Sequence, residues 1–438
     1  MAFEPSEGLY AGLAFVPTIE LTSAKTDVNK FKDLYFVALE TLKNSDKIKD
    51  GAGNQTRNGL IDVIDLTGNK DAKKEKEIYS DLAGAISATL ATRSKALNNQ
   101  LPSTVYLTGN RWHSDVEKFK VNAFGMSDYN SSDLILKTNG NNYTGISLKK
   151  KRKQQHESPT MINNAFSKFI EGRDFADVRS DLDEHRKKFF AKVIKEACEP
   201  GGSLSLYART NKSISSLNPD NLTDAETLWN TKITRIKNGK PKQEALINLK
   251  SESDLADLTG DVLNTQVKDA FRKFVNSKLE STTTNLNPLF KGFLDIMNRD
   301  DVKNKLADGL LNRVLKLNLL DELDTWEDND FYFYLVEGVG EYTTRGVPSV
   351  GTASVYDIHS VIVEMAKMSK LPAKMELDSE SLKPGKAKVL FNLKKGDIPI
   401  LKIELRYKGS FTAMPQFLAT MTDEFKEILH DAGDILRV

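Results

Sequence analysis

The feature that most constrains this chain is a predicted β-hairpin centred near residue 140. Residues 134–137 have an alternating β pattern, and a turn rich in glycine and asparagine follows at residues 139–142. The β pattern resumes at residues 143–148. These residues therefore predict two antiparallel strands joined by a tight turn.

Two residues of opposite charge border this hairpin. Asp133 opens the first strand, and Lys149 closes the second and begins a basic run at residues 149–153. An antiparallel pairing brings both to the same edge of a sheet. A carboxylate that holds a divalent cation beside a lysine that steadies a phosphate is the minimum for metal-assisted phosphodiester hydrolysis. Taken singly, Asp133 also fits a turn or capping residue, and Lys149 also fits a solvated charge run.

The pair of strands resembles the signature hairpin of the PD-(D/E)XK nuclease superfamily, which includes many restriction endonucleases and phage nucleases. That pattern has an aspartate on the first strand and then an acidic residue, any residue and a lysine on the second. Here Asp133 is followed by Ser147-Leu148-Lys149, so serine replaces the acid, and Ser132 stands where a proline often precedes the aspartate. The resemblance covers about residues 105–170.

The resemblance implies that a helix supplies the second carboxylate, as in serine-bearing members of the superfamily. Glu117 is the first candidate, on a helix expected over residues 111–124, with Asp115 behind it. Glu171, at the end of a helix expected over residues 160–172, is the alternative. Acids near a helix N-terminus also simply complement the helix dipole, so this reading stays open for Glu117.

The site implied by the resemblance is a Mg²⁺ site with an adjoining DNA-binding surface. Asp133, Glu117 and the Leu148 carbonyl would hold the cation, Lys149 would position water or stabilise the phosphate, and Ser147 takes the place of the motif acid. The expected contacts to the DNA backbone are Lys150, Lys151, Arg152, Arg406 and Lys408. The last two close a second predicted hairpin, residues 389–393 and 399–407, which also fits an ordinary half-exposed strand pair.

Composition limits the other classes of function. The net charge of +1 gives no global attraction to polyanions, so a nucleic-acid surface must be local. The single cysteine, Cys198, excludes an internal disulfide framework and a cysteine-based zinc site, and five scattered histidines disfavour a histidine-built one. No signal peptide or apolar run of membrane-spanning length is evident, so we expect a cytoplasmic protein of a bacterial or phage-infected cell, or a component of a phage particle.

The expected fold class is α+β, with a mixed β-sheet flanked by helices in a restriction-endonuclease-like core. We expect a helical region at 1–100, the first part of the core at 101–175, a mostly helical insertion at 176–330, and a β-rich part at 331–438 that completes the core. The expected function is a Mg²⁺-dependent DNA endonuclease, acting on double-stranded DNA and compatible with a homodimer. Ser147 argues for an alternative, a catalytically inactive nuclease-like DNA-binding or phage structural protein. The leucine-rich residues 302–323 suggest a third, a helix-mediated assembly factor.

Overall fold

The computed structural model shows an α+β protein that divides into two compact units. Unit 1 comprises Met1–Pro159, Val314–Lys370 and Asp423–Val438, and unit 2 comprises Thr160–Arg313 and Leu371–Thr422. The described residues are 3–69, 71–109, 111–120, 132–138, 140–151, 160–165, 175–198, 204, 206–237, 240–241, 247–248, 273–274, 277–278, 287–305, 307, 331–358, 360–361, 364, 373–378, 388–406, 416–431, 433 and 435–437.

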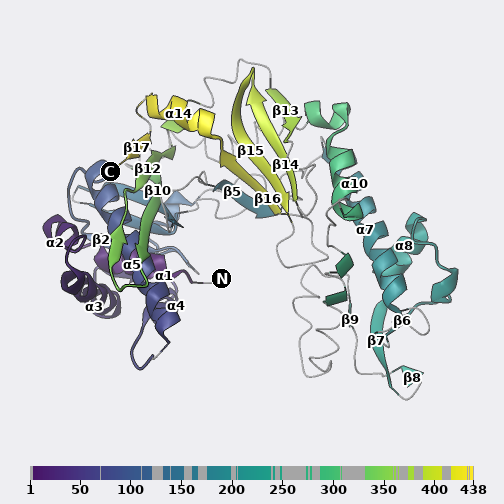
Figure 1. Ribbon diagram of the computed structural model, residues 1–438, viewed down its shortest axis with the longest axis horizontal. Helices are drawn as coiled ribbons and strands as arrows, with labels where there is room; N and C mark the ends of the chain where they lie inside the picture. Colours follow the sequence, from purple (N-terminus) through teal and green to yellow (C-terminus); the bar gives the residue numbers. More distant parts are fainter. Residues whose placement is uncertain are drawn as a thin grey trace. The chain divides into compact units, whose positions relative to one another are not determined.

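Unit 1 is built on a mixed sheet (Figure 1). Its path runs through β1 (Ile48–Asp50), β2 (Thr104–Leu107), β3 (Leu134–Lys137), β4 (Tyr143–Lys151), β10 (Phe331–Tyr342), β12 (Ser354–Asp357) and β17 (Ile435–Arg437), and β11 (Pro348–Val350) pairs with β10. The pairs β1/β2 and β4/β10 are parallel, whereas the remaining pairs are antiparallel. The expected hairpin is therefore confirmed as β3 and β4, in the interior of the sheet.

Helices cover one face of this sheet. They are α1 (Pro5–Leu13), α2 (Thr18–Ser23), α3 (Val28–Asn44), α4 (Gln55–Ile64) and α5 (Ala72–Lys95), and α14 (Asp423–Asp431) precedes β17. Helix α5 lies directly against β10: the hydroxyls of Ser80 and Ser87 accept hydrogen bonds from the backbone amides of Tyr342 and Val339 at 2.9 and 2.7 Å. The close approach needs glycine, because a Cβ at Gly338 would lie 2.3 Å from the Gly84 carbonyl oxygen. Apolar residues of α1, α3, α5 and the strands form one continuous core.

A buried arginine fixes the C-terminal end of α1. The Arg93 side chain, on α5, is 1% exposed and donates to the carbonyl oxygens of Val16 at 2.6 Å and Ala14 at 2.9 Å. It also donates to the Thr18 hydroxyl at 3.1 Å. The carbonyl oxygens at the end of α1 that lack intrahelical partners therefore accept hydrogen bonds from the positively charged Arg93 side chain. The helix dipole favours a positive charge at this end. At the other end, Pro5 begins the helix, where its fixed φ angle and missing N–H cost nothing.

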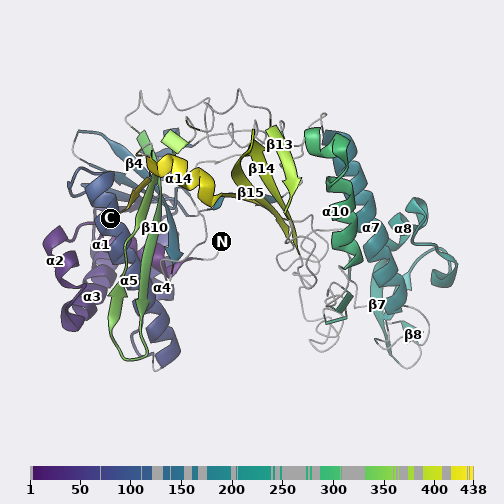
Figure 2. The ribbon, with the colours of Figure 1, turned by 45° about the horizontal axis from the view of Figure 1, so that its top comes forward.

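In its described residues, unit 2 holds two further sheets and three longer helices, all three of which are labelled in Figure 2. One sheet is antiparallel and contains β13 (Ala373–Leu377), β14 (Lys388–Lys395), β15 (Ile398–Arg406), β16 (Gln416–Met421) and β5 (Thr160–Ala165). The other contains β6 (Leu206–Arg209), β7 (Lys232–Lys237), β8 (Lys240–Pro241) and β9 (Ile247–Asn248). The helices are α7 (Ala176–Cys198), α8 (Leu222–Trp229) and α10 (Pro288–Met297), with a short 3-10 turn η3 (Ile214–Ser216).

Three expectations about local structure are corrected. The C-terminal hairpin, β14 and β15, belongs to the unit 2 sheet and does not complete the sheet of β3 and β4. The helix expected at 160–172 begins instead as strand β5, which pairs with β16. The helix expected at 111–124 is a 3-10 turn, η1 (Glu117–Phe119), in its described part. In the two segments expected as helices, pairing or packing with a distant segment overrides the local helical period.

Within the described residues, no helix is long and apolar enough to cross a membrane.

Candidate functional site

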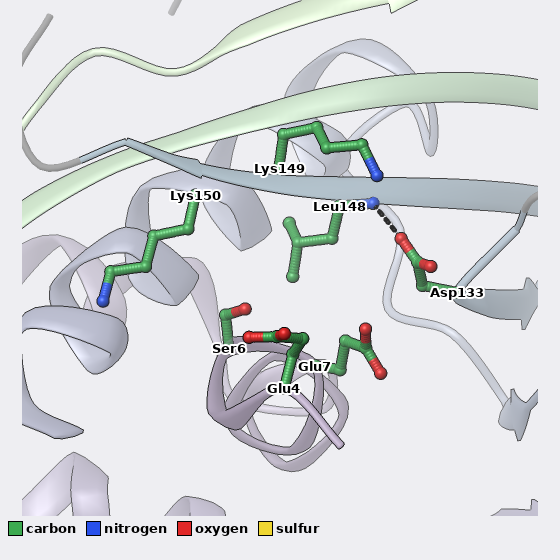
Figure 3. A pocket seen from close by; sticks show the side chains of 7 residues that line it. All are labelled: Glu4, Ser6, Glu7, Asp133, Leu148, Lys149 and Lys150. Atoms are coloured by element: carbon green, nitrogen blue, oxygen red, sulfur yellow. Dashed lines mark hydrogen bonds between the residues drawn. The ribbon is translucent and has the colours of Figure 1, made fainter. Parts of the chain in front are cut away.

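The structure brings Asp133 and Lys149 to the same end of the hairpin. Leu134 pairs with Ile146, and the Asp133 amide donates to the Ile146 carbonyl at 2.8 Å. Strand β4 continues beyond this point, and there the Leu148 amide donates to Asp133 Oδ2 at 2.6 Å (Figure 3). The Asp133 side chain thus accepts the hydrogen bond from β4 that a backbone carbonyl would accept if β3 were longer.

A pocket opens where β3 stops and β4 continues. It is lined by Glu4, Ser6, Glu7, Asp133, Leu148, Lys149 and Lys150. Figure 3 shows Leu148 and Lys149 leaving β4 on opposite sides, with Leu148 directed toward the first turn of α1. The N-terminal helix therefore supplies the acidic side of the pocket, and the hairpin supplies Asp133 and Lys149.

Burial and mutual repulsion raise the pKa of two pocket carboxyls. The pKa of Asp133 is raised by burial, against the lowering effects of the Lys149 charge, the Leu148 amide and a hydrogen bond from the Ser147 side chain. The pKa of Glu7 is raised to about 8, first by burial, then by the charges of Asp133 and Glu4, while Lys149 opposes the shift. Three acidic side chains share the pocket with Lys149 and Lys150, and Lys150 is paired with Asp81, so the acids favour an additional cation or a bound proton.

Asp133 and Glu7 carry oxygen donors of the kind that a hard divalent cation such as Mg²⁺ binds. Asp133 and Glu7 offer carboxylate oxygens that are costly to leave ionised without a counter-charge. The Leu148 carbonyl points to the same edge of β4 as its amide, because the two groups of one strand residue face the same neighbour. In the described part of the chain, no group of three or more His, Cys, Asp or Glu side chains is arranged to hold a metal ion. A Mg²⁺ ion here would use two carboxylates and complete its shell with water and substrate oxygens, as Mg²⁺ commonly does.

Ser147 supports Asp133. It lies on the same face of β4 as Lys149, is 3% exposed, and its side chain hydrogen-bonds to the Asp133 carboxylate. An acid at this position would add negative charge to a pocket that already holds three acidic side chains, two of them with raised pKa values. The serine instead gives Asp133 a second donor besides the Leu148 amide, which fixes the orientation of the carboxylate.

Glu117 and Asp115 lie away from this pocket. Glu117 is exposed on η1, whose Phe119 ring packs on Tyr143 at 5.0 Å between centroids. Tyr143 is at the other end of β4, six residues from Lys149, or about 20 Å along an extended strand. Asp115 accepts a hydrogen bond from the Tyr106 hydroxyl at 3.0 Å. Neither acid lines the pocket with Asp133.

The residues predicted to contact DNA are only partly described. Lys150 lines the pocket, but its ammonium forms an ion pair with Asp81 of α5. Lys151 ends β4 and is partly exposed. Arg406 lies in β15 of unit 2, where only its backbone is described. Arg152, Lys408 and the alternative acid Glu171 lie outside the described residues.

Sequence reasoning missed three acids near Lys149. Glu4 and Glu7 border a Pro at the first helical position, a signature of a helix N-terminus, but nothing local connects them with residue 133. Glu337 pairs in register with Lys149, is 8% exposed, and accepts a hydrogen bond from the Tyr356 hydroxyl at 3.3 Å. The sequence does not indicate Glu337 either, because only the parallel pairing of β4 with β10 brings it next to Lys149.

No protein-family model, curated protein or solved structure matches this chain. The chemistry of the pocket is therefore the main guide to function.

Proposed function

We propose that the protein is a Mg²⁺-dependent DNA endonuclease of the PD-(D/E)XK type, with its reaction centre in the pocket of Asp133. The observation that carries the proposal is one juxtaposition. The aspartate that precedes β3 and the lysine of β4 share a pocket with a second, half-buried carboxyl, Glu7, delivered by a helix. This is the arrangement expected when serine replaces the motif acid and a helix supplies the second carboxylate.

Asp133 and Glu7 would hold the cation, with the Leu148 carbonyl as a third oxygen. Bound there, Mg²⁺ would polarise the scissile phosphate and lower the pKa of a water molecule. The two carboxyls suit this role because their charges repel each other in a buried setting, and a divalent cation relieves that repulsion. Glu7 takes the part that the sequence suggested for Glu117.

The chain's own groups would position the reactants. The Leu148 amide and the Ser147 hydroxyl hold the Asp133 carboxylate in one orientation, so its remaining lone pairs point in a fixed direction. The Lys149 ammonium would contact a non-bridging phosphate oxygen or the attacking water and stabilise the negative charge that develops on the phosphate. Double-stranded DNA is the substrate that we propose.

Ser147 is also the observation that favours a second candidate, a nuclease-like DNA-binding or phage structural protein without catalytic activity. With serine in place of the acid, the site has one negative charge fewer on β4. A chain of this kind would bind DNA in a salt-dependent manner and leave it intact.

Nicking of a supercoiled plasmid with and without Mg²⁺ tests the proposal. Asp133→Asn, Glu7→Gln and Lys149→Gln should each lower the rate by roughly 100-fold or more, since each removes a charged group from the reaction centre. Glu117→Gln is the matched control, because it removes one acid outside the pocket lining, and it should change the rate less than about twofold. Equal nicking by wild type and Asp133→Asn would refute the site, and a loss with Glu117→Gln in place of Glu7→Gln would reassign the second carboxylate. DNA binding without nicking by the wild type would establish the second candidate.

A further inference from the structure

We infer a second contact point for the DNA backbone, formed by Lys118 and Lys137 around the ring of Tyr143. The inference rests on the proposed function for its ligand, duplex DNA. It assigns a binding role to residues outside the pocket and sets the length of duplex that the protein needs. Its basis is the arrangement of lysines over aromatic rings at the far end of β4.

Two ammonium groups converge on one ring. Lys137 pairs in register with Tyr143, and its Nζ lies 5.2 Å from the centre of the tyrosine ring. Lys118, from η1, places its Nζ 5.6 Å from the same ring and 4.9 Å from that of Phe119. All three distances are within the range of a cation–π interaction. Tyr143 and Phe119 are 7% and 1% exposed, so the rings form a packed base beneath the two charges.

Among the residues that the structure describes, no neighbouring acid neutralises the positive charge at this point. Within the described part of the chain, neither Lys118 nor Lys137 forms an ion pair with a carboxylate. The nearby Asp115 is occupied by the Tyr106 hydroxyl and lies 3.5 Å from a ring nitrogen of His113. Lys118 is exposed and Lys137 partly exposed, so both ammoniums are accessible to a polyanion. Aromatic rings stabilise such a cation without cancelling its charge, which leaves it available to a phosphate.

The position of this pair relative to the pocket specifies the ligand. Residues 137, 143 and 149 share one face of the sheet, because the pairing of Lys137 with Tyr143 and the two-residue period of β4 put them there. Tyr143 and Lys149 are separated by about 20 Å along the strand. Duplex DNA rises about 3.4 Å per base pair, so this span corresponds to about six base pairs. Ser147, between the two points, is buried, so the duplex would contact the protein at two separate places.

This assignment differs from the basic run predicted from the sequence. Lys150, on the opposite face of β4, is engaged by Asp81, whereas Lys118 and Lys137 are held only over aromatic rings among the described contacts. A duplex anchored at Lys118 and Lys137 would have its scissile phosphate at Lys149.

Fluorescence anisotropy with Asp133→Asn protein tests the inference without cleavage. In that background we compare Lys118→Gln/Lys137→Gln, which removes both charges but keeps the side-chain stems, with Lys25→Gln/Lys30→Gln, two exposed lysines outside the sheet. Between about 50 and 200 mM salt, the slope of log K against log salt should fall by about 1.8 in the first pair, or about 0.9 per phosphate contact, and stay unchanged in the second. Lys118→Arg/Lys137→Arg should restore it, because charge and not packing is responsible.

Duplex length provides the second arm. A duplex that extends about ten base pairs to each side of the cut should show the loss, and one that extends about three should not. An unchanged slope in the Lys118→Gln/Lys137→Gln protein would overturn the inference, as would weaker binding of an acidic polypeptide without any effect on DNA. Failure of the proposed function appears separately. If wild-type protein never nicks plasmid but the slope still falls, the contact stands and the endonuclease does not.

Discussion

Glu7→Gln is the substitution that most directly probes the pocket. It replaces a carboxyl whose pKa is raised from 4.5 to about 8 by a neutral group of nearly the same shape. In the metal-free protein at neutral pH, Glu7 is protonated. Above about pH 8, it ionises beside Asp133 and Glu4, and the folded state must then hold the repelling charges together.

The sign and size of the effect follow from linkage. Because the pKa of Glu7 is higher in the folded than in the unfolded protein, the folded state binds its proton more tightly, and stability falls as pH rises from about 4.5 to about 8. One pKa unit corresponds to about 1.4 kcal/mol, so the whole shift has an upper limit of about 5 kcal/mol. Since the carboxyl borders an open pocket and solvent screens it, we expect about 2–3 kcal/mol between pH 5 and pH 9. Glu7→Gln should abolish that loss.

Hydrogen exchange of peptides spanning residues 3–13 and 143–151 measures the effect locally, in EDTA and after correction for intrinsic exchange rates. Wild-type protein should lose protection in both peptides as pH rises, and Glu7→Gln should not. Mg²⁺ at pH 9 should restore protection in the wild type and have little effect on the variant, because the cation replaces the proton. Glu117→Gln serves as the control and should follow the wild type. The reasoning would be refuted if Glu7→Gln and wild type lost protection equally.

Three further predictions concern single residues. Ser147→Glu should lower the free energy of unfolding in EDTA by roughly 2–4 kcal/mol, because it buries another acid beside Asp133. Saturating Mg²⁺ should recover most of this loss in thermal unfolding, and equal melting temperatures with and without metal would contradict the prediction. Arg93→Met should cost roughly 2–4 kcal/mol in urea unfolding, because it leaves the carbonyls at the end of α1 without donors, and a cost below about 1 kcal/mol would show that α1 does not depend on them. Burial raises the pKa of the Cys198 thiol to about 12, so it should react with a thiol reagent at pH 8 only as fast as unit 2 unfolds, and rapid labelling of the native protein would disprove that.

The hairpin could be predicted because its information is local. Residues 134–148 contain the alternation, the turn and both bordering charges, and pairing them requires only that the turn close. The α+β class and the amphipathic helix α3 could be predicted for the same reason, since α3 shows the helical period over several turns. The aspartate–lysine half of the pocket therefore lies where the pattern indicates.

The acidic half could not be predicted, because it depends on packing between distant segments. Glu7 reaches Asp133 only through α1, whose place is set by the core and by Arg93 of α5. Glu117 had the better local argument, near the hairpin and on an expected helix, but the packing of Phe119 on Tyr143 holds its segment at the far end of β4. The strand β5 was mistaken for a helix because its pairing partner, β16, lies some 250 residues later in the sequence.

The parallel pairing of β4 with β10 has a consequence for synthesis of the chain on the ribosome. About 190 residues separate the ends of the two strands, so at roughly 5–20 residues per second the β10-side edge of β4 stays uncovered for about 10–40 s. An uncovered edge invites pairing with other nascent chains, and lysines are a common protection against it. Lys149, Lys150 and Lys151 end that strand. These three lysines would thus keep unfinished chains from pairing with one another before Lys149 takes its place in the pocket.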